Sequence, residues 1–383
     1  MDKGYVHVEI TASQSPKRAG SPCGDVVVHE RTSSSTVFVV CDGIGSGVKA
    51  HIAAQMCTSR ILGLLRQGFS MRRTFESLVQ TMEQAKGTDL PYAVFTIARI
   101  LNDGVATVLT YEMPPPVFVT SRYAQILPQR SLMVSNAVTG ESNCHIAPGE
   151  GILIVTDGIT QAGLGSGLPN GWTIDGAGQF INDCLNSGVK LKALPDCVID
   201  QAKQVWKTVQ GDDCTVALAS CRKGKTVTIF TGPPANRIKD VPAVKKFLSA
   251  QGSKVVCGGT TSKIVADYLG AEVTVELNPQ SLLCPASYNI PGIDLVTEGA
   301  VTLNQVYNIL EEDEIFDEIS GVTELQAMLR SADRVNIIVG QAVNPASKDI
   351  SFRQKGILTR HAVLPLIASK LRELGKLVVT EYV

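Results

Sequence analysis

The first part of the chain alternates short runs of β-branched residues with two blocks of helical periodicity. Runs dominated by Val, Ile and Thr, separated by polar turns, predict strands over residues 6–12, 25–30 and 36–42. Apolar residues then recur at helical spacing over 50–68 and 71–87, and both blocks end at a glycine, which helix C-caps prefer. We therefore expect two or three strands followed by two helices.

A second series of strands follows, and its turns indicate antiparallel pairing. Strand patterns cover residues 92–101, 104–112, 116–122 and 151–158. The Leu-Asn-Asp-Gly turn between the first two supplies the backbone angles of a tight hairpin. Helical stretches near 173–187 and 192–207 precede a last strand over 212–222. Paired helices and meandering strands predict an α/β sandwich with antiparallel sheets.

The pattern changes near residues 222–227. From there to the last residue, strands and helices alternate one by one. This alternation is typical of βαβ units, in which a helix connects two parallel strands. We therefore predict two domains, residues 1–224 and residues 225–383, and a mostly parallel sheet in the second.

Composition narrows the functional classes. The chain has 383 residues, of which 44% are hydrophobic and 19% charged, as in a soluble globular protein. Its net charge of −1, with both signs mixed throughout, argues against nucleic-acid or membrane partners. With no signal-peptide pattern and no apolar run of about 18 residues, we expect a cytoplasmic protein. The ten scattered cysteines include no CxxC pair and favour reduced, buried thiols over a zinc site or disulfides.

Four aspartates lie where predicted strands begin or end. Asp42 follows VFVVC, Asp157 follows ILIVT, Asp212 precedes a strand in GDDCTVALA, and Asp25 begins one. Any one of them alone is more often part of a turn than of a site. A cluster of carboxylates is costly without positive charge, and hard divalent cations prefer oxygen ligands. The set therefore favours a carboxylate-bound metal pair.

The glycines after Asp42 do not form a nucleotide fingerprint. The spacing Gly43, Gly45, Gly47 departs from GxGxxG, and residues 60–68 supply no acid. The sequence also contains no GxSxG or GxxxxGK[ST] motif, and its five histidines lack metal-ligand spacing. A bare carbonyl at Gly43 can instead reach a metal, while the later glycines allow a sharp strand-to-helix turn.

The ordered segments 24–25 (GD), 42–47 (DGIGSG), 156–160 (TDGIT) and 211–216 (GDDCTV) resemble metal-dependent serine/threonine phosphatases of the phosphatase 2C superfamily, in particular the bacterial SpoIIE and RsbU type. The resemblance covers about residues 1–222 and implies an αββα sandwich with antiparallel sheets. It also implies a site with two Mn²⁺ or Mg²⁺ ions. The implied ligands are Asp25, Asp42, the Gly43 carbonyl, Asp157 and Asp212, with Asp42 bridging the ions.

The sequence departs from the family pattern at positions that concern substrate contacts. Asp213 stands where many relatives have Asn, and we interpret it as a neighbour of the ligands. Glu112 and Met113 replace the Gly-His of the family's GHPPP segment, and no phosphate-clamp arginine precedes Asp25. A solvated loop is the favoured interpretation of the nearby Lys17-Arg18 pair, although these residues could contact a phosphate.

The resemblance implies hydrolysis of phosphoserine or phosphothreonine on a regulatory protein by a water that bridges the two metal ions. The substrate would then be a phosphorylated protein in a bacterial signalling switch. Two alternatives stay open at this stage. One is a non-catalytic binding or scaffold protein on a phosphatase fold, and the other is a phosphatase of a small phosphorylated molecule.

Three glycine-containing loops follow predicted strands of the second domain, at residues 257–263, 297–302 and 339–344. Strand ends of open α/β sheets are where ligands bind, so these loops could share one crevice. The candidate anion-binding loop is Gly258, Gly259, Thr260, Thr261 and Ser262, at a predicted helix start. Simple helix capping is the commoner role of such residues. Our hypothesis is that this domain binds a small ligand or protein partner and regulates the first.

Overall fold

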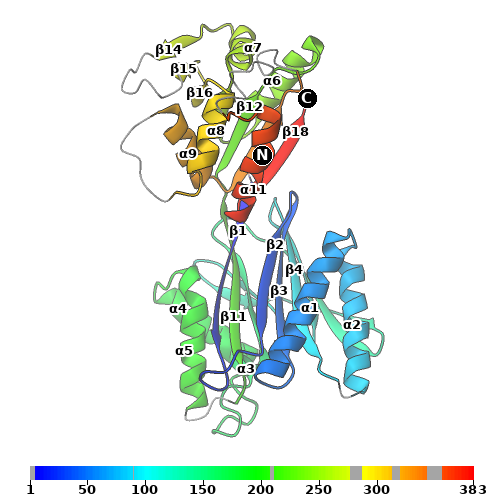
Figure 1. The fold of residues 1–383 in the computed structure, drawn as a ribbon. Helices are drawn as coiled ribbons and strands as arrows, with labels where there is room; N and C mark the ends of the chain where they lie inside the picture. The colour runs from blue at the N-terminus through cyan, green and yellow to red at the C-terminus, as the bar shows by residue number, and fades with distance from the viewer. Residues whose placement is uncertain (1–4, 89, 208–210, 277–286, 313–319, 343–355) are drawn as a thin grey trace. The chain divides into compact units, whose positions relative to one another are not determined.

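The computed structural model describes residues 5–88, 90–207, 211–276, 287–312, 320–342 and 356–383. The chain divides into two compact units, Met1–Lys223 and Gly224–Val383 (Figure 1). Each unit has its own hydrophobic cores.

Two antiparallel sheets form the centre of the first unit. The six-stranded sheet contains, in spatial order, β2 (Val26–Arg31), β3 (Ser35–Gly43), β4 (Ala93–Leu101), β5 (Val105–Tyr111), β9 (Ala137–His145) and β8 (Arg130–Val134). The five-stranded sheet contains β1 (Val6–Ser15), β11 (Cys214–Lys223), β10 (Gly151–Val155), β6 (Val117–Val119) and β7 (Ala124–Ile126). The predicted Leu-Asn-Asp-Gly hairpin is confirmed, because β4 and β5 pair antiparallel across it.

Helices cover the outer faces of both sheets. The six-stranded sheet packs against α1 (Val48–Arg66) and α2 (Met71–Gly87), and the five-stranded sheet against α4 (Thr173–Asn186) and α5 (Leu194–Trp206) (Figure 1). A short 3₁₀ turn, η1 (Leu191–Ala193), precedes α5. The expected αββα sandwich with antiparallel sheets is therefore confirmed.

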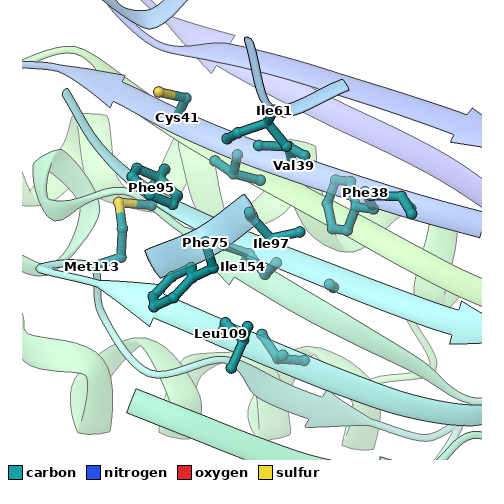
Figure 2. Packing of buried hydrophobic residues seen from close by; sticks show 14 of the residues in the cluster. Phe38, Val39, Cys41, Ile61, Phe75, Phe95, Ile97, Leu109, Met113 and Ile154 are labelled. Atoms are coloured by element: carbon teal, nitrogen blue, oxygen red, sulfur yellow. The ribbon is translucent and has the colours of Figure 1, made fainter. Parts of the chain in front are cut away.

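The hydrophobic core around the six-stranded sheet explains why β3 contains a continuous apolar run. Every residue of β3 is buried, since one face of the strand meets the helices and the other meets the second sheet. Figure 2 shows Phe75 of α2 beside Phe95 of β4, with Ile154 of β10 contributed by the other sheet. The rings of Phe75 and Phe95 meet edge to face at 5.5 Å.

The prediction for this unit was wrong at the end of one strand and missed three strands. The strand expected over 151–158 ends at Val155, and Asp157 begins a short helix, α3 (Asp157–Thr160). The strands β7, β8 and β9 were not predicted, because much of the segment 124–145 is polar and only part of it is buried.

The second unit contains a seven-stranded sheet. Its spatial order is β14 (Thr274–Glu276), β15 (Ser287–Asn289), β16 (Leu295–Thr297), β13 (Ser253–Cys257), β12 (Thr226–Thr231), β17 (Arg334–Val339) and β18 (Leu377–Tyr382). The five strands from β16 to β18 are parallel, and β14 and β15 pair antiparallel at one edge. The mostly parallel sheet is therefore confirmed.

Helices cover both faces of this sheet. One face packs against α6 (Asp240–Ser249), which follows the 3₁₀ turn η2 (Arg237–Lys239), and α7 (Gly259–Leu269). The other face packs against α8 (Ala300–Ile309), α9 (Gly321–Ser331) and α11 (Arg360–Glu373). Because β16, β13, β12 and β17 are parallel, the loops that follow them lie at one edge of the sheet.

Two further observations concern the whole chain. Among the helices that the structure describes, none is both long and apolar enough to cross a membrane. The nine cysteines within the described ranges are free thiols, five of them buried and four partly exposed, and Cys284 lies outside those ranges.

Candidate functional site

The pairing of β2 with β3 brings Asp25 and Asp42 together. Val26 lies opposite Cys41 in the antiparallel register, so Asp25, just before β2, comes next to Asp42 near the end of β3. Both side chains are buried, with exposed fractions of 2% and 8%. Two carboxylates from separate segments thus share one interior position.

The other two predicted aspartates reach the same place from the second sheet. Val155 of β10 lies opposite Val216 of β11, so α3, which follows β10, starts close to the residues that precede β11. Asp157 is the first residue of α3 and Asp212 lies two residues before β11. The negative charges of Asp157, Asp212 and Asp25 all act on Asp42. The charges of all four aspartates thus interact across the two sheets, and we call this group the aspartate cluster.

Burial and mutual repulsion disfavour ionisation in this cluster. Burial is the largest cause that raises the pKa of Asp42 well above its usual range, and the charge of Asp25 is the next. Burial also raises the pKa of Asp25 to about 6, against the opposing effect of hydrogen bonds from Thr215 and Thr156. The pKa of Asp212 is raised as well, mainly by burial. Without a cation, Asp25, Asp42 and Asp212 therefore keep their protons to higher pH than exposed aspartates do.

Hydrogen bonds hold the carboxylates but leave some oxygens unpaired. Thr156 Oγ1 donates to Asp25 Oδ2 at 2.9 Å, and Gln161 Nε2 donates to Asp157 Oδ2 at 2.6 Å. The Oδ1 atoms of Asp25 and Asp157 are buried and have no partner among the described residues. Buried oxygens of this kind are unfavourable without a donor or a cation.

Asp213 has a structural role that the sequence did not reveal. Its carboxylate accepts hydrogen bonds from the backbone N–H groups of Lys17 at 2.6 Å and Gly24 at 3.0 Å. It thereby fixes both ends of the loop that leads into Asp25. Thr156 and Gln161, which orient two of the aspartates, were also missed. Their only sequence signal is proximity to the Asp-Gly pair at 157–158.

Glycines allow the backbone to approach closely around the cluster. A Cβ at Gly43 would overlap the carbonyl oxygen of Ala50, and one at Gly158 would overlap the carbonyl oxygen of Asp213. Gly45 and Gly47 have φ values of 106° and 74°, and α1 begins immediately afterwards. The glycines of DGIGSG therefore shape the turn between Asp42 and the helix.

The positions that depart from the family pattern differ in their surroundings, and Glu112 has a left-handed backbone with φ of 49°. The Glu112 carboxylate accepts a hydrogen bond from Lys86 Nζ at 2.7 Å. The positive charge of Lys17 opposes the rise in the pKa of Asp212. Lys17 is therefore the basic residue of the 17–18 pair whose charge is felt in the cluster.

The donor chemistry of the aspartate cluster fits a divalent cation. Within the described ranges, no three His, Cys, Asp or Glu side chains converge as they would around a bound ion. The cluster nevertheless presents carboxylates with raised pKa values and two buried, unpaired oxygens. Hard cations such as Mn²⁺ and Mg²⁺ neutralise carboxylate groups of this kind.

Comparisons with known proteins found one matching family model and several similar solved structures. A family model described as stage II sporulation protein E (SpoIIE) matches residues 32–222. A search of curated proteins found no match. Solved structures with similar folds include the RsbU and RsbW domains of a Mycobacterium tuberculosis protein, at 16% identity over 70% of this chain and 71% of that one, with a TM-score of 0.49.

Two further solved structures match part of this chain. One is the PP2C phosphatase domain of SpoIIE from Bacillus subtilis with a fragment of its regulatory domain, at 16% identity, 57% and 64% coverage and a TM-score of 0.48. The other is the SiaA-PP2C domain of Pseudomonas aeruginosa, at 14% identity, 55% and 84% coverage and a TM-score of 0.43. The family match includes Asp42, Asp157 and Asp212, and it confirms the resemblance drawn from the motifs. Residues 32–222 of this chain, just under half of its length, match the SpoIIE family model.

Proposed function

We propose that the first unit is a phosphatase that hydrolyses phosphoserine or phosphothreonine on a regulatory protein, with two Mn²⁺ or Mg²⁺ ions as cofactors. The observation that carries the proposal is the aspartate cluster, in which the charges of four acids from both sheets interact and two carboxylate oxygens are buried without a partner. Such an arrangement is unfavourable in isolation and becomes favourable around cations.

The residues of the cluster have distinct roles in this proposal. Asp25, Asp42, Asp157, Asp212 and the Gly43 carbonyl would hold the ions. When bound, the ions would supply an activated water for attack on phosphorus and neutralise charge on the phosphoryl oxygens.

Neighbouring side chains keep the carboxylates in position. Thr156 and Gln161 each donate to one carboxylate oxygen and leave the other oxygen of the same aspartate available. Asp213 holds the loop that carries Lys17 and Gly24.

A cysteine nucleophile is disfavoured beside the cluster. Cys23 is the half-buried thiol on which the charges of Asp25 and Asp213 act. Burial and the negative charge of Asp25 raise the pKa of the Cys23 thiol to about 12, so it stays protonated at neutral pH. This supports attack by water.

The test is Mn²⁺-dependent phosphate release from three substrates: a phosphoserine protein, a phosphoserine peptide and an aryl phosphate. Asp42→Asn and Asp157→Asn should abolish release, and Asp200→Asn, on the exposed surface of α5, should leave it unchanged. Undiminished turnover in either cluster variant would contradict the proposal. Preference for small phosphate esters would favour a small-molecule phosphatase, and no hydrolysis of any substrate would favour a non-catalytic binding role.

A further inference from the structure

Two helix N-termini lie side by side in the second unit, where the parallel strands of the sheet have their carboxyl ends. The N-cap of α7 is Gly258, with φ of 115°, and the N-cap of α8 is Gly299, with φ of 142°. They follow β13 and β16, which are parallel neighbours with Cys257 opposite Thr297. A Cβ at Gly299 would lie 3.1 Å from Gly258 Cα, so the two N-caps are in contact.

The first turn of α7 has backbone N–H groups that could bind an anion. Neither N-cap residue caps its helix with a side chain, and the first turn of both helices lacks an acidic residue. Glu298 lies just before α8, where its Oε2 accepts a hydrogen bond from the Val301 N–H at 3.2 Å. This carboxylate therefore caps the N-terminus of α8. Free N–H groups and the helix dipole favour negative charge at the start of α7.

Two buried threonine hydroxyls provide an independent sign of a ligand. Thr261 and Thr302 are the third residues of α7 and α8, and each side chain has an exposed fraction of 1%. Both Oγ1 atoms are buried and have no hydrogen-bond partner in the described parts of the chain. Thr261 Oγ1 lies 3.5 Å from the position that a Cβ would take at Gly258, so this hydroxyl faces the N-cap. A buried hydroxyl without a partner is unfavourable unless a ligand forms a hydrogen bond with it.

We propose that the second unit binds the phosphate group of a small phosphorylated molecule at the N-terminus of α7. The N–H groups of Gly259 and Thr260 and the hydroxyl of Thr261 would donate to phosphate oxygens, and the Thr302 hydroxyl would complete the site from α8. Phosphate offers several strong acceptors at once, which matches this excess of donors. A Cβ at Gly299 would press against Gly258 Cα at 3.1 Å, and the φ values of both glycines disfavour any other residue, so the backbone at the two N-caps stays bare. This site does not depend on the aspartate cluster or on phosphatase activity.

The test is a titration of the full chain by isothermal calorimetry in EDTA, which keeps divalent cations away from the aspartate cluster. The probes are inorganic phosphate, ribose 5-phosphate and AMP, which distinguish free phosphate from phosphate esters. Thr261→Val removes the hydroxyl and keeps the shape of the side chain. The matched control is Thr74→Val, which removes another fully buried, unpaired helical hydroxyl, in the first unit.

We expect saturable binding of at least one probe by the unmodified chain and by Thr74→Val. Thr261→Val should weaken that binding about tenfold or more, the effect of losing one hydrogen bond to a charged group. Its thermal midpoint without ligand should not fall, because the hydroxyl has no partner to lose. Thr302→Val provides the same comparison if Thr261→Val does not fold. No saturable binding of any probe, or equal binding by the threonine variants and the control, would overturn the proposal.

Discussion

Replacing Asp25 with asparagine tests whether the aspartate cluster stores electrostatic strain in the absence of cations. The substitution removes one buried charge and keeps the shape of the side chain. The amide oxygen of asparagine can still accept the hydrogen bond from Thr156 Oγ1, which is 2.9 Å long in the structure. Its NH₂ group can donate to Asp42, the neighbouring carboxyl group.

The size of the effect follows from the pKa of Asp25. Folding raises this pKa from 3.8 to about 6, mainly through burial. One pKa unit corresponds to about 1.4 kcal/mol, so ionised Asp25 lowers the free energy of unfolding by about 3 kcal/mol. Because the folded state holds the proton more tightly, stability should fall as the pH rises from about 4 to about 6 and stay low above that.

Thermal unfolding in EDTA at pH 4.5 and pH 7.5 measures this effect. At pH 7.5, Asp25→Asn should unfold about 6–12 °C above the unmodified chain, the shift expected from 3 kcal/mol in a domain of about 200 residues. The difference should be much smaller at pH 4.5. Added Mn²⁺ should raise the midpoint of the unmodified chain more than that of the variant, because in the proposed site Asp25 is a ligand of a cation that binds the folded state.

The control is Asp200→Asn, which removes a carboxylate whose side chain is 72% exposed on α5. It should change the midpoint little at either pH. The reasoning fails if Asp25→Asn is no more stable than the unmodified chain at pH 7.5 in EDTA. It also fails if the gain is equal at both pH values. A full Mn²⁺ response in the variant would contradict a ligand role for Asp25.

Three further substitutions probe the surroundings of the cluster. Asp213→Ala removes the acceptor of two backbone N–H groups in the loop 17–24, so urea denaturation should show a loss of about 2–3 kcal/mol; an unchanged midpoint would contradict this structural role. Gly158→Ala should lower both stability and phosphatase activity because its Cβ would overlap the Asp213 carbonyl, whereas Gly63→Ala, in open space on α1, should be neutral or stabilising in the same assays. Phe38→Ala should cost about 3–5 kcal/mol by urea denaturation, since the ring is fully buried in the larger core, and a loss below 1 kcal/mol would argue against that packing.

The regular elements were predictable where side chains repeat with one period. Continuous β-branched runs marked β3 and β10 because strands covered on both faces need apolar residues at every position. The strands β7 and β8 carry no such signal, since they are short and partly exposed. Their positions depend on pairing with β6 and β9, which are themselves set by distant parts of the chain.

The four aspartates could be found from the sequence because each stands beside a strand end with glycine or another acid nearby. The interactions among these aspartates could not be found from the sequence, because they depend on which strand ends lie next to one another. The register of β2 against β3 joins Asp25 to Asp42, and the pairing of β10 with β11 adds Asp157 and Asp212. The same pairing places Asp213 where its carboxylate binds the backbone of the loop 17–24, although Asp213 is adjacent in sequence to Asp212.

The sequence by itself determined the order of most elements, the change from antiparallel to parallel organisation near residue 224, and the identity of the candidate acids. Local periodicity and residue type carry that information without reference to distant segments. Only the tertiary structure decided which carboxylate oxygens are buried and unpaired, and that α7 and α8 begin side by side with unpaired threonine hydroxyls. Burial and hydrogen-bond partners are set by residues far apart in the chain, so they exist only once the sheets have formed.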